Sequence, residues 1–216
     1  QADEHHAYGY GAEKFFWATV SACGIFFLGA GVTIYHGIDA YLHPHVTEFS
    51  VWVYWILIVS FVIEAFTLYK AYNEIMHVGE DTFMENLQYA DPVSIAVFYE
   101  DFVAVLGVAV AFVSIFLTKL TGNNLFDAFG SVIIGTLLAG VAVLLLNMNR
   151  KYLVGRSIPR DTEEGIKELL LNDKHVEKII DFKSEILDIG KYRIKCEIEF
   201  KGYALVSDIF KNEDME

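Results

Sequence analysis

The sequence predicts an α-helical membrane protein with four transmembrane helices and a small α+β domain at its carboxyl end. Hydrophobic residues make up 54% of the 216-residue chain, and they gather in long runs, which is unusual for a soluble domain. Near the carboxyl end, apolar and charged residues alternate instead, as in a half-buried strand. We therefore divide the chain into an amino-terminal segment over 1–15, a transmembrane domain over 16–155 and an α+β domain over 156–216.

Four apolar runs are expected to be the membrane helices, because each is about as long as a bilayer is thick. They cover residues 16–38, 51–72, 94–117 and 128–146. Each is apolar around its whole circumference, which is typical of a helix that faces lipid or other helices. Glycines in the first and fourth runs predict close helix packing; they are Gly24, Gly29, Gly31, Gly130, Gly135 and Gly140.

Basic residues near the ends of the runs predict the orientation of the helices. Lys119 is alone on one side of the predicted bundle. The residues on the other side are Lys14, Lys70, Arg150, Lys151 and Arg156. By the positive-inside rule, the amino terminus and the tail then face the cytoplasm or the matrix.

The tail is expected to fold as a helix followed by two strands. Asp161 is expected to cap the helix, with Glu164 three residues later completing a capping box. A first strand is expected around 176–187, and a second over 193–201, where the alternation is cleanest. A further helix is expected from about residue 204.

Charge and cysteine content exclude several classes of function. A formal net charge of −13 argues against nucleic-acid binding, which needs basic patches. Cys23 and Cys196 do not form a disulfide framework. The sequence holds neither a nucleophile–base pair nor a Cys-x-x-Cys motif, so we expect no enzyme and no organic cofactor.

Three carboxylates lie inside the apolar runs. Glu64 is in the second run, and the adjacent Glu100 and Asp101 are in the third. A carboxylate at membrane depth is costly and usually marks an ion or proton pathway. Consecutive residues project about 100° apart on a helix, so both acids cannot enter one narrow site. We expect Asp101 to face the pathway and Glu100 to face a neighbouring helix.

Short motifs run along nearly the whole chain. They are Tyr8-Gly9-Tyr10-Gly11, Tyr35-His36-Gly37-Ile38, Leu42-His43-Pro44, Asp91-Pro92, Glu100-Asp101, Leu120-Thr121-Gly122-Asn123, Gly130-Ser131, Gly135-Thr136-Leu137-Leu138, Gly155-Arg156-Ser157-Ile158 and Asn172-Asp173. Each is weak alone. In this order and spacing they resemble the cation diffusion facilitator family, and in particular its mitochondrial zinc transporter nine-like branch.

The resemblance implies a six-span transporter with a ferredoxin-like tail domain. This chain would hold family spans three to six and part of that domain, and would lack the first two spans. The family's zinc site draws half its ligands from the second span and half from a His-x-x-x-Asp motif in the fifth. Asp101 matches the aspartate, whereas Val97 stands at the histidine position, a departure that the branch shares through its Glu-Asp pair.

The resemblance makes Asp101, Glu100 and Glu64 the candidate metal-site residues, with zinc as the transported ion. Asp101 would bind the cation and release it on protonation, or the acid pair would be a relic bonded within the helix bundle. Glu64, which the branch also carries, would be a proton relay or make a structural hydrogen bond to another helix.

Four further residues that could bind metal are expected to be structural. The histidines suit zinc, but they lie at the far end of the first span, where a turn or headgroup contact is favoured: His36, His43 and His45. Asp127 is expected to cap the fourth helix.

Two functions stay open. The first is zinc/proton antiport in the mitochondrial inner membrane by a multi-pass protein, with the missing spans supplied by a partner. The second is a structural accessory subunit of a larger assembly in that membrane, such as a respiratory complex. Both predict membrane lipid and protein partners, an oligomer and no nucleic acid.

Overall fold

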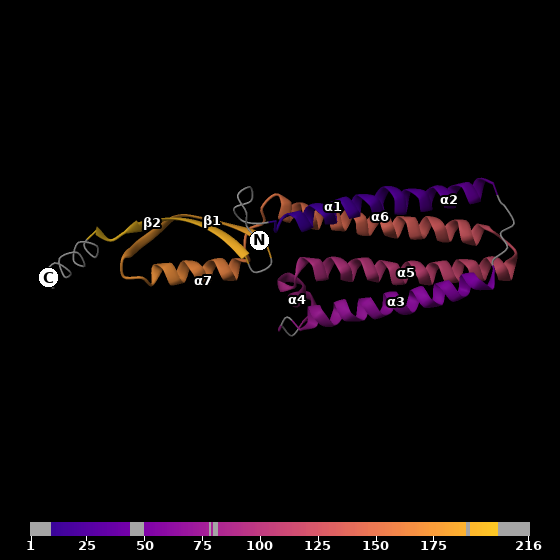
Figure 1. Cartoon of the computed structure of the whole chain (residues 1–216), viewed down its shortest axis with the longest axis horizontal. Helices are drawn as coiled ribbons and strands as arrows, with labels where there is room; N and C mark the ends of the chain where they lie inside the picture. Colours follow the sequence, from indigo (N-terminus) through magenta and orange to yellow (C-terminus); the bar gives the residue numbers. More distant parts are fainter. Residues whose placement is uncertain (1–9, 44–49, 78, 80–81, 189–190, 203–216) are drawn as a thin grey trace. The chain divides into compact units, whose positions relative to one another are not determined.

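The computed structural model describes residues 10–43, 50–77, 79, 82–188 and 191–202. The chain forms two compact units, and Figure 1 shows their elements. The larger unit comprises residues 16–149 and holds most of the long helices. The smaller unit combines residues 1–15 with residues 150–216 and holds the sheet.

Four stretches of helix in the described part of the chain are long and apolar enough to cross a membrane. The first is built from three consecutive segments, and each of the others is one helix. The elements are α1 (Glu13–Gly24), η1 (Ile25–Ala30), α2 (Gly31–Leu42), α3 (Val51–Met76), α5 (Pro92–Thr121) and α6 (Leu125–Leu153). The predicted four-helix membrane fold is confirmed.

The helices extend beyond their apolar runs to polar caps. The Ser50 hydroxyl accepts a hydrogen bond from the Trp52 backbone N–H at the start of α3. At the end of α5, Gly122 has a φ of 69°, a left-handed conformation that glycine adopts without steric cost. The predicted cap of α6 is wrong: Asn123 Oδ1 accepts from the Leu125 N–H, and Asp127 lies in the first helical turn.

The first span contains a π-helical segment, η1, that the sequence did not predict. Apolar composition cannot reveal it, because a π-helix differs from an α-helix only in which carbonyl each backbone N–H meets. A second unpredicted element is α4 (Phe83–Tyr89), between the second and third apolar runs. The Phe83 ring stacks on that of Tyr72, with the ring centroids 5.5 Å apart.

Glycines bring the membrane helices into close contact. A Cβ added at Gly37 would lie 2.9 Å from a backbone carbonyl oxygen of α6, and one at Gly135 would lie 3.0 Å from the Ile34 backbone nitrogen of α2. At Gly130, α6 packs directly on the Ser114 side chain of α5. Small residues therefore set the helix spacing here, as the glycine pattern of the fourth span predicts.

The smaller unit contains α7 (Arg160–Leu171) and the antiparallel strands β1 (Val176–Asp188) and β2 (Lys191–Phe200). This confirms a small α+β tail. The predicted cap of α7 is wrong, because Pro159 occupies the capping position and Asp161 lies in the first turn. Pro159 has a ψ of 145°, outside the helical range, so the helix begins at Arg160. The helix expected from residue 204 lies outside the described residues.

Candidate functional site

Asp101 carries an enclosed carboxylate oxygen within a membrane-spanning helix. Its Oδ2 is buried and has no hydrogen-bond partner among the described residues. An unpaired charged oxygen is costly in any apolar environment, and more so at membrane depth. This oxygen is therefore a candidate to bind a cation.

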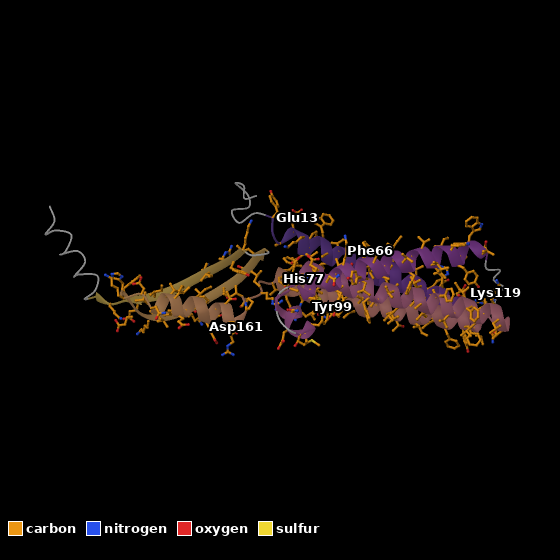
Figure 2. All side chains as sticks on the ribbon, turned by 90° about the horizontal axis from the view of Figure 1, so that it is seen from below. Glu13, Phe66, His77, Tyr99, Lys119 and Asp161 are labelled. Atoms are coloured by element: carbon orange, nitrogen blue, oxygen red, sulfur yellow. The ribbon has the colours of Figure 1, made fainter. Side chains whose placement is uncertain are left out.

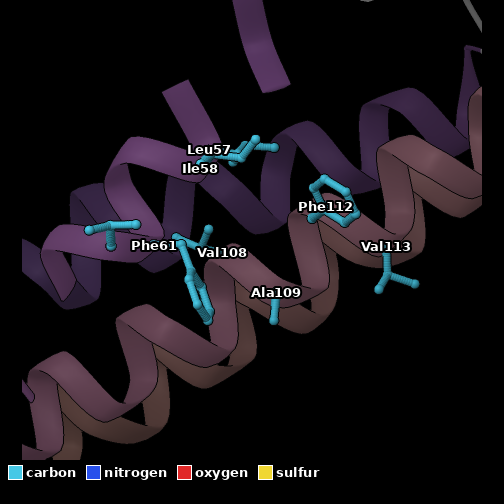
Figure 3. A pocket seen from close by; sticks show the side chains of 8 residues that line it. Leu57, Ile58, Phe61, Val108, Ala109, Phe112 and Val113 are labelled. Carbon is cyan, nitrogen blue, oxygen red and sulfur yellow. The ribbon is translucent and has the colours of Figure 1, made fainter. Parts of the chain in front are cut away.

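The face of α5 that carries Asp101 is turned towards α3. Residues of these two helices line an apolar pocket of about 330 Å³, seen from close by in Figure 3. Val108 and Phe112 of α5 face Leu57 and Phe61 of α3 across it. Val108 and Phe112 follow Asp101 by seven and eleven residues, which is two and three helical turns, so all three share one face of α5.

Glu64 lies on the side of α3 that faces α5, at a depth in the helix bundle similar to that of Asp101. It is half-buried, and Ala71, two turns further along α3, is buried. The rings of Tyr54 and Phe112 lie 6.1 Å apart and set the register of these antiparallel helices. When this register is followed from Tyr54 along α3, Glu64 comes level with the turn of α5 that follows Asp101. The two carboxylates are thus separated in depth by about one helical turn or less, roughly 5 Å.

Glu100 lies on a different side of α5. Ala96, Tyr99 and Val103 of this helix pack against a core cluster formed by Ala22 of α1 with α6 residues. Glu100 follows Ala96 by one turn and precedes Val103 by almost one turn, which places it towards that cluster. The spacing agrees with the expectation that Glu100 points towards a neighbouring helix and not along the face of α5 that carries Asp101.

The three acids do not assemble into a complete metal site. In the ranges that the structure describes, no group of three or more His, Cys, Asp or Glu side chains could hold a metal ion. Structural and catalytic zinc sites in proteins use about four ligands. Asp101, Glu100 and Glu64 therefore remain candidates, and this part of the chain supplies only some of the ligands that zinc needs.

The acid pair lies nearer to the basic side of the bundle than to the other side. Figure 2 shows His77 and Lys119 at opposite ends of the larger unit, with Tyr99 towards the His77 end. Tyr99 immediately precedes Glu100 and Asp101. In the predicted orientation, these carboxylates would be closer to the cytoplasmic or matrix surface.

The histidines of the first span do not join the acids. The His43 Nδ1 lies 3.1 Å from Asp39 Oδ1 at the end of α2. His36 is exposed and packs edge-on against the Tyr35 ring, and His45 lies outside the described residues. The contacts of His36 and His43 are local to α2, which fits a structural role.

Sequence reasoning missed Asp91 as a candidate. Its Oδ1 is enclosed without a hydrogen-bond partner among the described residues, and it precedes Pro92, the first residue of α5. Ten residues separate it from Asp101, about 15 Å along a helix. The Asp-Pro pair was visible in the sequence, but a cap before proline is common, and only the structure shows the enclosed oxygen.

The comparisons with known proteins give one family. The family model for the cation efflux transmembrane domain matches residues 1–154. The mitochondrial proton-coupled zinc antiporter SLC30A9 of Homo sapiens is 37% identical over 218 residues, which is 99% of this chain and 38% of that protein. The same antiporter of Xenopus laevis is 38% identical over 218 residues, 99% of this chain and 39% of that protein.

A plant protein is similar over the same stretch. Metal tolerance protein C4 of Arabidopsis thaliana is 35% identical over 222 residues, which is 99% of this chain and 48% of that protein. The chain therefore spans less than half the length of each of these relatives.

These relatives bear on two of the predictions. Their mitochondrial names and the four apolar helices support a multi-pass protein of the mitochondrial inner membrane, whereas neither the family nor the relatives support the accessory-subunit alternative. With the family model matching most of the chain and the resemblance extending through the tail, the chain belongs to the cation efflux, or cation diffusion facilitator, family of cation transporters.

Proposed function

We propose that this chain takes part in exchanging zinc, or a related divalent cation, for protons across the mitochondrial inner membrane, with Asp101 binding both. The observation that carries the proposal is the enclosed Oδ2 of Asp101, which has no hydrogen-bond partner among the described residues. The printed names of the animal relatives, which are proton-coupled zinc antiporters, support the choice of ions.

Exchange follows from the chemistry of a carboxylate in an apolar helix bundle. An empty, ionised Asp101 is costly at membrane depth, so the group alternates between a cation-bound state and a protonated state. Metal ligands must be deprotonated, so one proton arriving at the carboxylate releases the cation, and one proton leaves as the cation binds. Because the two states exclude each other, the movement of cations is coupled to the opposite movement of protons.

Glu64 is proposed to carry protons to and from Asp101. It lies on the facing side of α3 at a neighbouring depth, and it is half-buried. Glu100 faces another helix and would support the position of α5. The remaining zinc ligands would come from outside the described residues, either from other parts of the whole protein or from a partner chain.

The substitution Asp101→Asn tests the proposal. An amide oxygen is a poor ligand for zinc, and even groups outside the ligand shell contribute 10–100-fold to metal binding or activity. Zinc uptake should therefore fall by roughly a hundredfold or more, while assembly stays intact because the side-chain volume is unchanged. The measurement is zinc uptake under a pH gradient into vesicles that hold the complete transporter.

Asp127→Asn provides the matched control, since it makes the same chemical change in the first turn of α6, on a different helix from Asp101 and Glu64. Uptake by this variant should equal that of the wild type. If the Asp101→Asn variant takes up zinc as fast as the wild type, Asp101 has no part in the mechanism. If zinc uptake by the wild type does not depend on the pH gradient, proton coupling is refuted.

Glu64→Gln separates the two roles that are open for Glu64. A proton relay predicts that the variant keeps part of its zinc uptake but loses much of the pH dependence, because an amide cannot carry a proton in this pH range. A structural hydrogen bond predicts an unchanged pH profile and a lower melting temperature. Uptake should therefore be measured over a range of pH values, beside a thermal melt of the purified protein.

A further inference from the structure

An open cavity of about 410 Å³ lies on the hairpin of the smaller unit. Lys183 and Glu185 of β1, and Arg193 and Lys195 of β2, contribute to its walls, together with Gly155 from the segment after α6. The cavity falls within the size range of small-ligand sites. Three of its four charged side chains are cationic, in a protein whose overall charge is −13.

The register of the hairpin places like charges opposite each other in this cavity. Lys183 pairs with Lys195, and on the next rung of the same face Glu185 pairs with Arg193. Opposing like charges on neighbouring strands are destabilising. An anion between the two lysines would remove that repulsion.

Two of the acids close to the cavity are already engaged, and a third, Glu197, lies opposite Asp181 on the rung beside the lysine pair. Arg193 Nη1 donates to Glu185 Oε2 at 3.0 Å, and Lys183 Nζ lies 2.5 Å from Asp181 Oδ2. The hydrogen bond with Asp181 holds the pKa of Lys183 above its usual value, so this lysine stays charged at physiological pH. Lys195 has no ion-pair partner among the residues that the structure describes, so its positive charge is available to a ligand.

The opposite face of the hairpin is covered by α7. Lys167 of α7 lies over the Phe182 ring, with its Nζ 5.0 Å from the ring centroid. Phe182 and Lys183 are consecutive, so they project to opposite faces of β1. The basic cavity is therefore on the face that α7 leaves open.

The cavity is also close to the end of a membrane span. Val154 and Gly155, which line it, directly follow Leu153, the last residue of α6. Phospholipid phosphates lie in the headgroup layer that flanks the hydrocarbon core, which is where a transmembrane helix ends. Further basic residues flank this point in the sequence: Arg150, Lys151 and Arg156.

From this cavity, the opposed lysines Lys183 and Lys195 and its place after α6, we infer that it binds a phosphate group, supplied by an anionic phospholipid of the membrane. Lys183 and Lys195 would hold the phosphate between them, and Arg193 would lie at the side of the site. Basic pockets beside transmembrane helices are suited to anionic headgroups in this way. The site is distinct from the acids of the membrane helices and does not depend on the proposed transport mechanism.

Lipid titration of the full chain tests the inference. The protein, purified in a neutral detergent, is mixed with short-chain phosphatidylglycerol, phosphatidylcholine or inorganic phosphate, and binding is read by native mass spectrometry and by backbone NMR shifts of Gly155 and Lys195. Phosphatidylglycerol should bind and phosphatidylcholine should not. Binding of inorganic phosphate with equal affinity would support the phosphate site but assign it a soluble ligand instead of a lipid.

The double variant Lys183→Gln/Lys195→Gln should weaken phosphatidylglycerol binding about 25-fold, at about fivefold for each lysine. Lys178→Gln/Lys201→Gln is the control, because it removes the same charge from exposed positions outside the cavity, and it should bind as the wild type does. Lys195→Arg, which keeps the charge, should retain binding even if the double variant folds poorly. Equal losses in the two double variants, or no preference for phosphatidylglycerol, would overturn the inference.

Discussion

Charged side chains have different surroundings in the membrane helices and on the tail hairpin. On the hairpin, several charges lie in water beside opposite charges: Lys178 lies 2.7 Å from Glu199, and both are exposed. In the helices, Asp101 has an enclosed oxygen with no partner among the described residues. Exposed ion pairs contribute little to stability, whereas an unpaired acid at membrane depth is costly. An exposed ion pair is therefore far less informative about function than an unpaired acid at membrane depth.

The two units also differ in what holds them together. The membrane helices approach each other at glycines, where backbone nearly meets backbone, as at Gly37. The smaller unit relies on the β1–β2 ladder and on α7. A single added methyl group should consequently do more damage in the helices than in the tail.

Gly37→Ala should cause the largest loss of stability. The new Cβ would lie 2.9 Å from the Ala128 backbone oxygen and 2.8 Å from Val132 Cγ2, so α2 and α6 must separate. Overpacking of this kind costs about 1–3 kcal/mol. Thermal unfolding in detergent, followed by circular dichroism, measures the effect. Gly24→Ala is the control, since nothing lies within 4 Å of its added Cβ, and it should be neutral or mildly stabilising.

Gly155→Ala should have a smaller and more local effect. Gly155 has a φ of 94°, and adopting a left-handed backbone costs a residue with a Cβ about 1–2 kcal/mol. The added Cβ would also approach Glu185 Oε1 at 3.1 Å, although that flexible side chain can move away. Faster hydrogen exchange in β1 and β2 is the expected result. Gly165→Ala, in open space on α7, should not accelerate exchange, and identical exchange in both variants would contradict the strain argument.

Acid pH should produce the smallest effect, at the turn before β1. The His175 backbone N–H donates to Asp173 Oδ1 at 2.8 Å, and this bond lowers the pKa of Asp173. A lowered pKa means that the contribution to stability is complete above the ordinary aspartate value of about 3.9 and is lost as the pH falls through the lower folded value. Amide exchange at His175 should thus accelerate only in strong acid. In Asp173→Asn, that acceleration should be absent.

Much of the candidate site could be predicted from the amino-acid sequence alone. Glu64, Glu100 and Asp101 stand out because ionisable residues are rare in apolar runs. The sequence could not show which carboxylate oxygen is enclosed, because that depends on how α3 and α5 pack around it. Asp91 was missed for the same reason, since its sequence context is that of an ordinary helix cap before proline.

The sequence by itself determined the four membrane helices, the alternating strand β2 and the family, because hydrophobic length, period-two alternation and ordered motifs are properties of the chain alone. Only the tertiary structure decided the register that opposes Lys183 to Lys195, the contact of Gly37 with α6, and the unpartnered oxygen of Asp101. These features depend on which residues from distant parts of the chain come together. Local sequence preferences act over a few residues and do not specify such contacts.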